Sequence, residues 1–69
     1  MRLDSRIENQ ELFARLVKEI GGARKASFFI KELRGAAPSK SAIDRAVRGE
    51  ASNDYQLLNM IRDLEVILR

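Results

Sequence analysis

The sequence predicts an all-α fold, one compact domain built of four helices. Apolar residues recur at steps of three and four through most of the chain, which is the period of an amphipathic helix. The four glycines and the single proline fall between these periodic stretches, where helices end. No alternating run of β-branched residues occurs, so no strand is expected. A chain of 69 residues holds one domain, near the lower size limit for folding without a disulfide or a metal.

The first predicted helix covers residues 6–20. Ser5 and Glu8 have the spacing of a capping box, in which each side chain accepts a hydrogen bond from the backbone amide of the other residue. Gly21 and Gly22 are expected to end the helix, because glycine readily adopts the left-handed conformation of a C-cap. The apolar positions of this helix share one face: Leu12, Phe13, Leu16, Val17 and Ile20.

The second and third predicted helices cover residues 23–34 and 39–48. Gly35 is placed to cap the second helix, Pro38 cannot continue it, and Ser39 is a favourable N-cap for the third. The inner face of the second helix is expected to hold Ala26, Phe29 or Ile30, and Leu33, with one of the two rings Phe28 and Phe29 in the core and the other at an edge or interface. The inner face of the third is expected to hold Ala42, Ile43, Ala46 and Val47.

The fourth predicted helix covers residues 54–68, with candidate caps at Ser52, Asn53 and Asp54. Its inward stripe is expected to contain Leu57, Ile61, Leu64 and Leu68. The helix carries more apolar residues than one buried stripe needs. The surplus residues are Leu58 and Val66, with Tyr55 and Ile67 as further members. We therefore expect a homodimer that forms through the C-terminal helix.

Composition argues against several classes of protein. The chain has no histidine and no cysteine, so it lacks the commonest general base, the strongest nucleophile and the usual soft-metal ligands. We therefore expect no enzymatic activity and no cofactor or metal, and we expect the carboxylates Asp54, Asp63 and Glu65 at helix caps and exposed positions. No stretch approaches the apolar length of a membrane span or of a signal-peptide core, which favours a cytoplasmic protein without a membrane partner.

Charge is concentrated in the middle third of the chain. Residues 21–49 carry seven basic side chains against two acidic ones, whereas residues 1–20 balance four against four and residues 50–69 carry two against four. The basic side chains of the middle third are Arg24, Lys25, Lys31, Arg34, Lys40, Arg45 and Arg48. A local excess on one supersecondary unit is typical of a nucleic-acid-binding surface. A solvated helical surface rich in Lys and Arg explains the charge equally well.

Two segments of this basic region resemble the helix-turn-helix of lambda-repressor-like regulators of phages and plasmids, a family that includes the Cro proteins. They are residues 21–26 (GGARKA) and residues 39–49 (SKSAIDRAVRG), and residues 57–61 resemble the helix that follows the motif. The resemblance implies double-stranded DNA as the partner and residues 39–48 as the recognition helix. The family has a shorter turn and usually five helices, so residues 31–38 predict a lengthened second helix or turn here.

The resemblance also implies which residues contact DNA. They are Arg24, Lys25, Ser39, Lys40, Ser41, Asp44, Arg45 and Arg48. Ser39 is expected to serve first as an N-cap, and Asp44 either accepts a hydrogen bond from cytosine or, as we favour, pairs with Arg48 four residues later. Arg45 has the planar donor set that fits guanine or phosphate. Lys31 and Arg34 are expected to be plain solvated charges.

These features lead to two hypotheses of different classes. The first is a transcriptional regulator, a homodimeric repressor on a pseudo-palindromic operator, because the helix-turn-helix takes up the length and occluding a promoter needs binding alone. The second is a small helical protein-interaction module, an inhibitor or antitoxin-like protein, whose basic face binds an acidic protein. The first hypothesis requires the basic residues to share one face with the beginning of the 39–48 helix.

Overall fold

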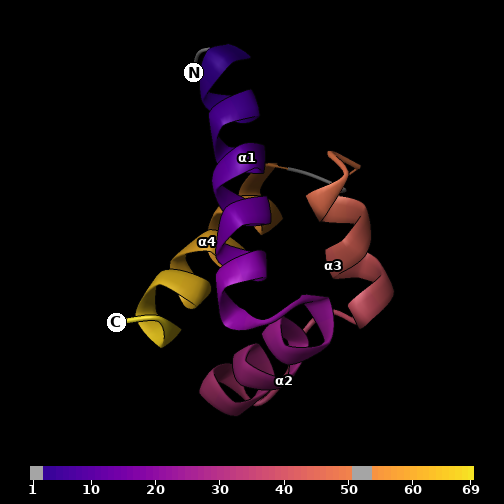
Figure 1. Ribbon diagram of the computed structural model, residues 1–69, viewed down its shortest axis with the longest axis vertical. Helices are drawn as coiled ribbons and strands as arrows, with labels where there is room; N and C mark the ends of the chain where they lie inside the picture. The colour runs from indigo at the N-terminus through magenta and orange to yellow at the C-terminus, as the bar shows by residue number, and fades with distance from the viewer. Residues whose placement is uncertain (1–2, 51–53) are drawn as a thin grey trace.

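The computed structural model describes residues 3–50 and 54–69, with side chains from Ile7 onward (Figure 1). The chain forms four helices with no strand in these ranges, which confirms the predicted all-α fold. The helices are α1 (Leu3–Ile20), α2 (Ala23–Arg34), α3 (Lys40–Val47) and α4 (Asp54–Ile67). Within the same ranges, no helix has both the length and the apolar character needed to cross a bilayer.

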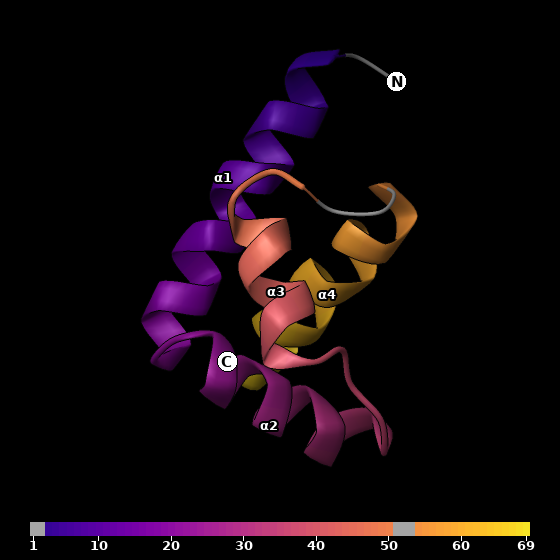
Figure 2. The ribbon, with the colours of Figure 1, turned by 90° about the vertical axis from the view of Figure 1, so that its right-hand side faces the viewer.

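The long helix α1 forms one side of the molecule, and the other three helices pack around it. In Figure 1, α4 crosses behind α1, α3 stands to the right of both, and α2 runs beneath them. A quarter turn brings α3 to the front with α4 behind it, while α2 lies across the base (Figure 2). The outward sides of α3 and α4 therefore lie on different sides of the molecule.

One large side chain from each helix meets in the centre of the core. Phe13, Ile30, Ile43 and Leu64 are all fully buried, one each from α1, α2, α3 and α4. Each such burial contributes roughly 1.5–3 kcal/mol relative to an exposed side chain. The remaining buried apolar residues complete this core: Leu16, Val17, Ile20, Ala23, Ala26, Ala46, Leu57, Met60 and Ile61. Leu12, Ala37, Val47 and Ile67 pack against it while partly exposed.

The predicted start of the first helix is wrong by three residues. The helix begins at Leu3, so Ser5 lies inside its first turn and cannot be the N-cap. No glycine or proline stands before Ser5, and the helix therefore continues over those positions. The Ser5 side chain lies outside the described side chains. The caps predicted at residues 52–53 also lie outside the described part of the chain, in which α4 begins at Asp54.

The second helix has its predicted bounds, and the third is one residue shorter at each end than predicted. Gly35 caps α2 in the left-handed conformation with φ 87°, and its amide donates to the Lys31 carbonyl over 2.7 Å. A side chain with a Cβ is disfavoured at such a φ, which explains glycine here. Ser39 is the N-cap of α3 and Arg48 is its C-cap.

The outer face of α2 departs from the prediction. Neither phenylalanine lies in the core: Phe28 is 56% exposed and Phe29 is 38% exposed, and Ile30 occupies the buried position instead. Leu33, predicted on the inner face, is 47% exposed. It belongs to the last turn of α2, which Figure 2 shows extending past α3. The other helices therefore do not cover the last turn of α2.

The apolar stripe of α4 is confirmed for Leu57, Ile61 and Leu64, all of which are buried. Leu68 is exposed, because it follows the last helical residue at the end of the chain. Ile67, predicted as a surplus residue, is partly buried against the core of its own chain. The other three surplus residues are exposed on the outward face: Tyr55, Leu58 and Val66.

An ion pair joins the end of α2 to α4. The Arg34 Nε lies 2.6 Å from the Asp63 Oδ2, and the Asp63 residue is only 5% exposed. The expectation that Asp63 is exposed and Arg34 merely solvated is therefore wrong. Asp63 follows Met60 by three positions on the inner side of α4, where helical spacing turns its carboxylate toward α2. A buried carboxylate needs a partner, and Arg34 supplies one.

We expect Arg34→Met to lower the free energy of unfolding by about 1–3 kcal/mol, because the buried Asp63 carboxylate would lose its partner. Lys31→Met is the matched control on the same helix, since Lys31 is exposed and has no ion pair among the described residues. Met, Lys and Arg have similar helix propensities. Urea unfolding followed by circular dichroism measures both variants. Equal effects of the two substitutions would show that the bridge does not stabilise the fold.

Candidate nucleic-acid interface

The outward face of α3 is polar and uncovered by the described chain. Only Ile43 and Ala46 of this eight-residue helix are buried. Ser41 lies at the centre of the opposite face, because helical spacing puts it farthest from these two residues. Small and branched apolar residues inside, with an exposed polar face outside, are the features that a helix needs to enter the major groove.

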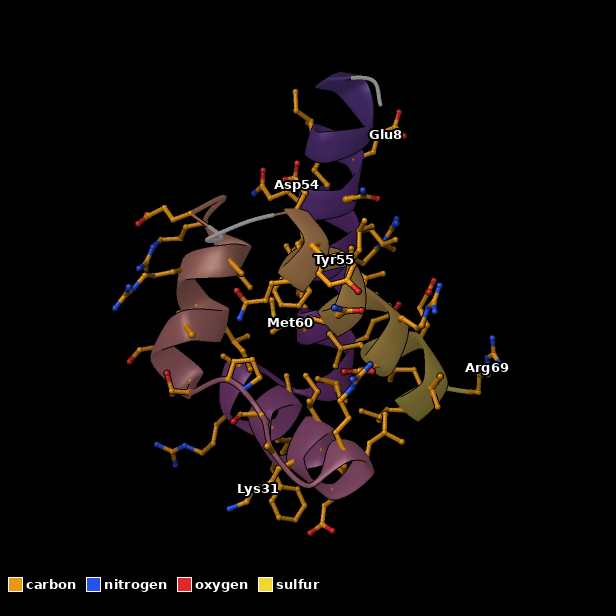
Figure 3. The ribbon with its side chains drawn as sticks, turned by 180° about the vertical axis from the view of Figure 1, so that it is seen from behind. Glu8, Lys31, Asp54, Tyr55, Met60 and Arg69 are labelled. Carbon is orange, nitrogen blue, oxygen red and sulfur yellow. The ribbon has the colours of Figure 1, made fainter. Side chains whose placement is uncertain are left out.

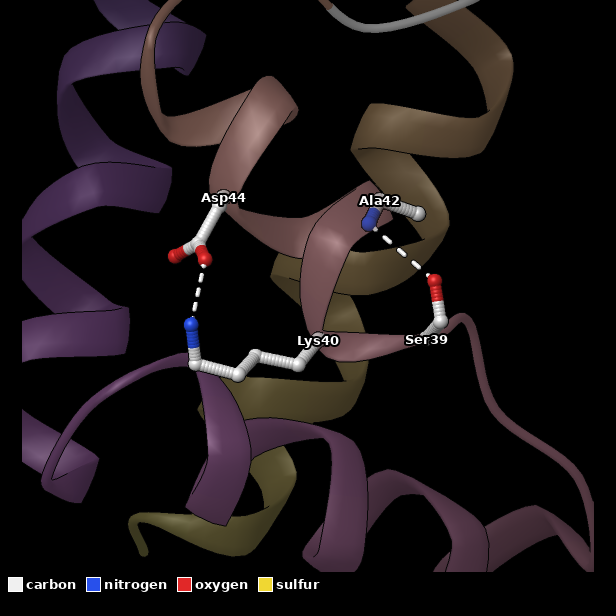
Figure 4. A network of polar contacts seen from close by, with 4 residues as sticks. All are labelled: Ser39, Lys40, Ala42 and Asp44. Atoms are coloured by element: carbon white, nitrogen blue, oxygen red, sulfur yellow. Dashed lines mark hydrogen bonds and ion pairs between the residues drawn. The ribbon is translucent and has the colours of Figure 1, made fainter.

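The beginning of α3 is held in place by Ser39. Its Oγ accepts a hydrogen bond from the Ala42 amide over 3.2 Å, as Figure 4 shows. The predicted N-cap role is therefore confirmed. A serine hydroxyl has one proton to donate besides its acceptor positions, so the capped Ser39 can still donate to a phosphate oxygen.

Lys40 and Asp44 form an ion pair along one flank of α3. The Lys40 Nζ lies 2.8 Å from the Asp44 Oδ2, four residues later (Figure 4). The predicted pair between Asp44 and Arg48 is therefore wrong. Arg48 stands after the last residue of α3, and its Nε lies 3.4 Å from the Glu50 Oε2. Lys40 pairs with Asp44 from one turn earlier, and Arg48 turns to Glu50 instead.

Lys40 and Arg48 can still bind a ligand, because both of their ion pairs are weak. All four side chains are partly exposed, and pairs of this kind contribute about 0–1 kcal/mol. A phosphate carries a full charge and sits close to several cations at once, so it can displace a single carboxylate from Lys40 or Arg48 at small cost.

Arg45 occupies the opposite flank of α3 from Lys40. It is exposed, and it lines a small hollow of about 50 Å³ together with Pro38 and Gln56. Within the described residues its guanidinium forms no ion pair. Among the predicted contact residues of α3, Arg45 is therefore the cation with all of its donors open to a ligand.

Helix α2 contributes cations on the flank that adjoins the beginning of α3. Ser27 marks this flank, because its Oγ donates to the Pro38 carbonyl just before α3. Arg24 and Lys31 are exposed and lie within four residues of Ser27 on either side, so helical spacing gives them the same flank. Figure 3 shows Lys31 projecting away from the body of the molecule. Lys25 is exposed but lies on the outer side of α2, away from this flank.

Two hydrogen bonds set the position of α3, and the sequence pattern indicates neither of them. The Ser27 Oγ lies 2.7 Å from the Pro38 oxygen, which ties the segment between α2 and α3 to α2. The Gln10 Nε2 donates to the Val47 carbonyl over 3.1 Å, which ties the end of α3 to α1. The connection between α2 and α3 has five residues, 35–39. Lys31 is exposed and unpaired among the described residues, as predicted for a solvated charge, and its seven-residue spacing from Arg24 puts it on the same flank of α2.

Comparison of the chain with family models, with curated proteins and with solved structures returned no match. In the part of the chain that the structure describes, no group of acidic, cysteine or histidine residues is arranged to hold a metal ion. The resemblance to lambda-repressor-like regulators therefore stays a prediction that rests on its own residues.

We expect Ser27→Ala to lower the free energy of unfolding by about 0.5–1.5 kcal/mol relative to Ser41→Ala, because only Ser27 bonds to Pro38. Both serines lie inside helices, so the helix-propensity gain of alanine is common to the two variants. Thermal and urea unfolding measure the difference. If both variants had the same stability, the bond between α2 and the connection would not hold α3 in place.

Proposed function

We propose that the protein is a sequence-specific regulator of transcription that binds double-stranded DNA, with α3 as its recognition helix. The observation that carries the proposal is the free polar face of α3 bordered by the cations of α2. Arg45, Lys40 and Ser41 would face the bases, while Arg24 and Lys31 would meet phosphates. Arg48 and Ser39 would bind the backbone at the two ends of the helix.

This proposal agrees with the resemblance to phage and plasmid regulators, and it needs no catalytic step. We infer a repressor rather than an activator, because a bound protein can block a promoter by occupying it. We also infer a cytoplasmic location, as for the phage and plasmid regulators that the sequence resembles. Asp44 would keep Lys40 extended along α3 until a phosphate or base edge replaces the carboxylate.

The outward face of α4 supports a homodimer as the active form. Tyr55 is 77% exposed and projects from α4 in Figure 3, and Leu58 and Val66 lie two turns apart on the same side. In an antiparallel pair of α4 helices around a twofold axis, Leu58 of one copy would lie opposite Val66 of the other. Arg62 would lie at the axis, with Glu65 one turn away to balance its charge. Such a dimer would present two α3 helices to one duplex.

Selection of bound duplexes from a random DNA pool tests the proposal directly. We expect an enriched palindrome whose half-sites are about 34 Å apart, one turn of duplex. Enrichment of a sequence without symmetry would support DNA binding but contradict the dimer. No enrichment over a protein-free control would contradict the regulator and favour the helical protein-interaction module instead.

We expect Arg45→Ala to weaken binding to the selected duplex about tenfold to a hundredfold, because a bidentate arginine contact is worth about 1–3 kcal/mol. Arg15→Ala is the matched control: it removes the same side chain from an exposed position on α1. Gel-shift titration at one fixed salt concentration measures both, with circular dichroism to confirm folding. Equal affinities of the two variants would remove Arg45 from the recognition surface.

We expect the double variant Leu58→Glu with Val66→Glu to be a folded monomer that binds the selected duplex far more weakly. The added carboxylates would face each other across the twofold axis, and like charges there oppose association. Leu33→Glu is the control, because it places a carboxylate on an exposed leucine of α2 instead. Sedimentation velocity gives the oligomeric state. A wild-type monomer at high micromolar concentration would contradict the dimer.

A further inference from the structure

The outer side of α2 carries an open apolar groove that the proposed DNA interface does not use. It encloses about 460 Å³ between the end of α1 and the first turns of α2. Its lining residues are Ile20, Arg24, Lys25, Phe28 and Phe29. The exposed side chain of Leu33 lies farther along the same helix. Contiguous exposed apolar surface of this kind marks binding sites in soluble proteins.

The two phenylalanine rings support each other in the groove. Their centroids are 5.4 Å apart and their planes meet at 75°, which is an edge-to-face contact. This contact restrains the orientation of both rings although neither is in the core. A partner therefore meets an apolar surface that is already ordered and loses little side-chain freedom on binding.

The charges around the groove indicate what kind of partner fits it. Arg24 and Lys25 line the groove one turn before Phe28 and Phe29, and neither cation forms an ion pair with a described residue. The exposed acid Glu32 lies on the same side of α2 one turn past the two rings. A complementary partner therefore has carboxylates only at the end that meets Arg24 and Lys25, and apolar side chains beside the rings. A second copy of this chain is disfavoured, because a twofold contact here would place these cations against their own equivalents.

The backbone around the groove indicates the form of that partner. The described chain has no strand, so no sheet edge offers main-chain hydrogen bonds to an extended peptide. A helix brings its own backbone hydrogen bonds to such a surface, whereas an extended peptide would have to leave its backbone groups to water. The stretch from Arg24 to Leu33 is about 14 Å long, which matches two to three helical turns. We propose that this groove binds an acidic amphipathic helix of a partner protein.

The proposed helix partner would compete with DNA through one shared residue. Arg24 lines the groove and also borders the DNA interface proposed above, so a bound acidic helix would cover it. Phe28 and Phe29 belong to the groove alone. Their substitution therefore separates the two activities, and the groove is a feature beyond the DNA-binding function.

The test is a selection of helix-forming peptides from a random displayed library against the whole protein. We expect enriched peptides to carry Leu or Phe at helical spacing beside Glu or Asp. The binding of one synthetic enriched peptide is then measured by fluorescence anisotropy. We expect Phe28→Ala with Phe29→Ala, and separately Lys25→Glu, to weaken it about tenfold or more, which corresponds to about 1.4 kcal/mol.

Matched controls make the outcome decisive. Tyr55→Ala removes an exposed aromatic ring from α4 and should leave peptide affinity unchanged. Phe28→Ala alone is the milder variant, and circular dichroism confirms the folding of each protein. The double phenylalanine variant should bind the DNA selected in the earlier experiment as the wild type does. If the DNA proposal fails, Arg45→Ala will not change the affinity for DNA. That outcome would not affect the peptide affinities measured here.

Three results would overturn the proposal. The first is the absence of an enriched acidic, apolar peptide family, or an enriched peptide whose affinity survives the phenylalanine substitutions. The second is binding through Phe28 and Phe29 to vesicles of anionic lipid with no peptide binding, which would identify a membrane surface. The third is self-association that the double phenylalanine variant abolishes, which would identify a second copy as the occupant.

Discussion

The burial of one large side chain from each helix is the constraint on which the structure depends. Phe13, Ile30, Ile43 and Leu64 meet where α1, α2, α3 and α4 converge, and a domain of this size has few other residues to bury. Together the four contribute roughly 6–12 kcal/mol, which is comparable to the 5–15 kcal/mol by which folded proteins are stable. Helix α3 buries only Ile43 and Ala46 and adds the partly exposed Val47, and for this reason most of its surface stays outside.

Hydrogen bonds and one ion pair position the helix ends, which the apolar core does not fix. Apolar packing is not directional. It holds the helices together but does not determine where the end of each helix lies against its neighbours. Bonds from Ser27 and Gln10 hold the two ends of α3, and the pair of Arg34 with Asp63 holds the end of α2 against α4. Each contributes little to the free energy of unfolding compared with the core. Their effect is to select one arrangement of helices that are already packed.

The sequence predicted most of the local structure, because helix periodicity and caps depend on neighbouring residues, but it missed the start of α1 and the partner of Asp44. It predicted α2 to the residue and the Ser39 cap correctly, and it identified the basic stretch. It could not identify partners that meet only after folding, such as Gln10 and Val47, which are 37 residues apart. Phe28 and Phe29 were misplaced for a related reason: spacing alone does not show which helix faces will be covered. For Asp63 a usable signal existed, since an acid within an apolar stripe needs a partner.

The uneven charge of the chain becomes an electric dipole once the helices are packed. The net positive segment, residues 21–49, forms α2 and α3, whereas the net negative segment, residues 50–69, forms α4 on another side. In the field of a polyanion such a molecule experiences a torque as well as an attraction. The segment of α2 and α3 is attracted and α4 is repelled, so a single copy of the chain turns its α3 side toward the polyanion as it approaches. Dissolved salt shortens the range of this alignment to about one Debye length, ~8 Å at physiological ionic strength.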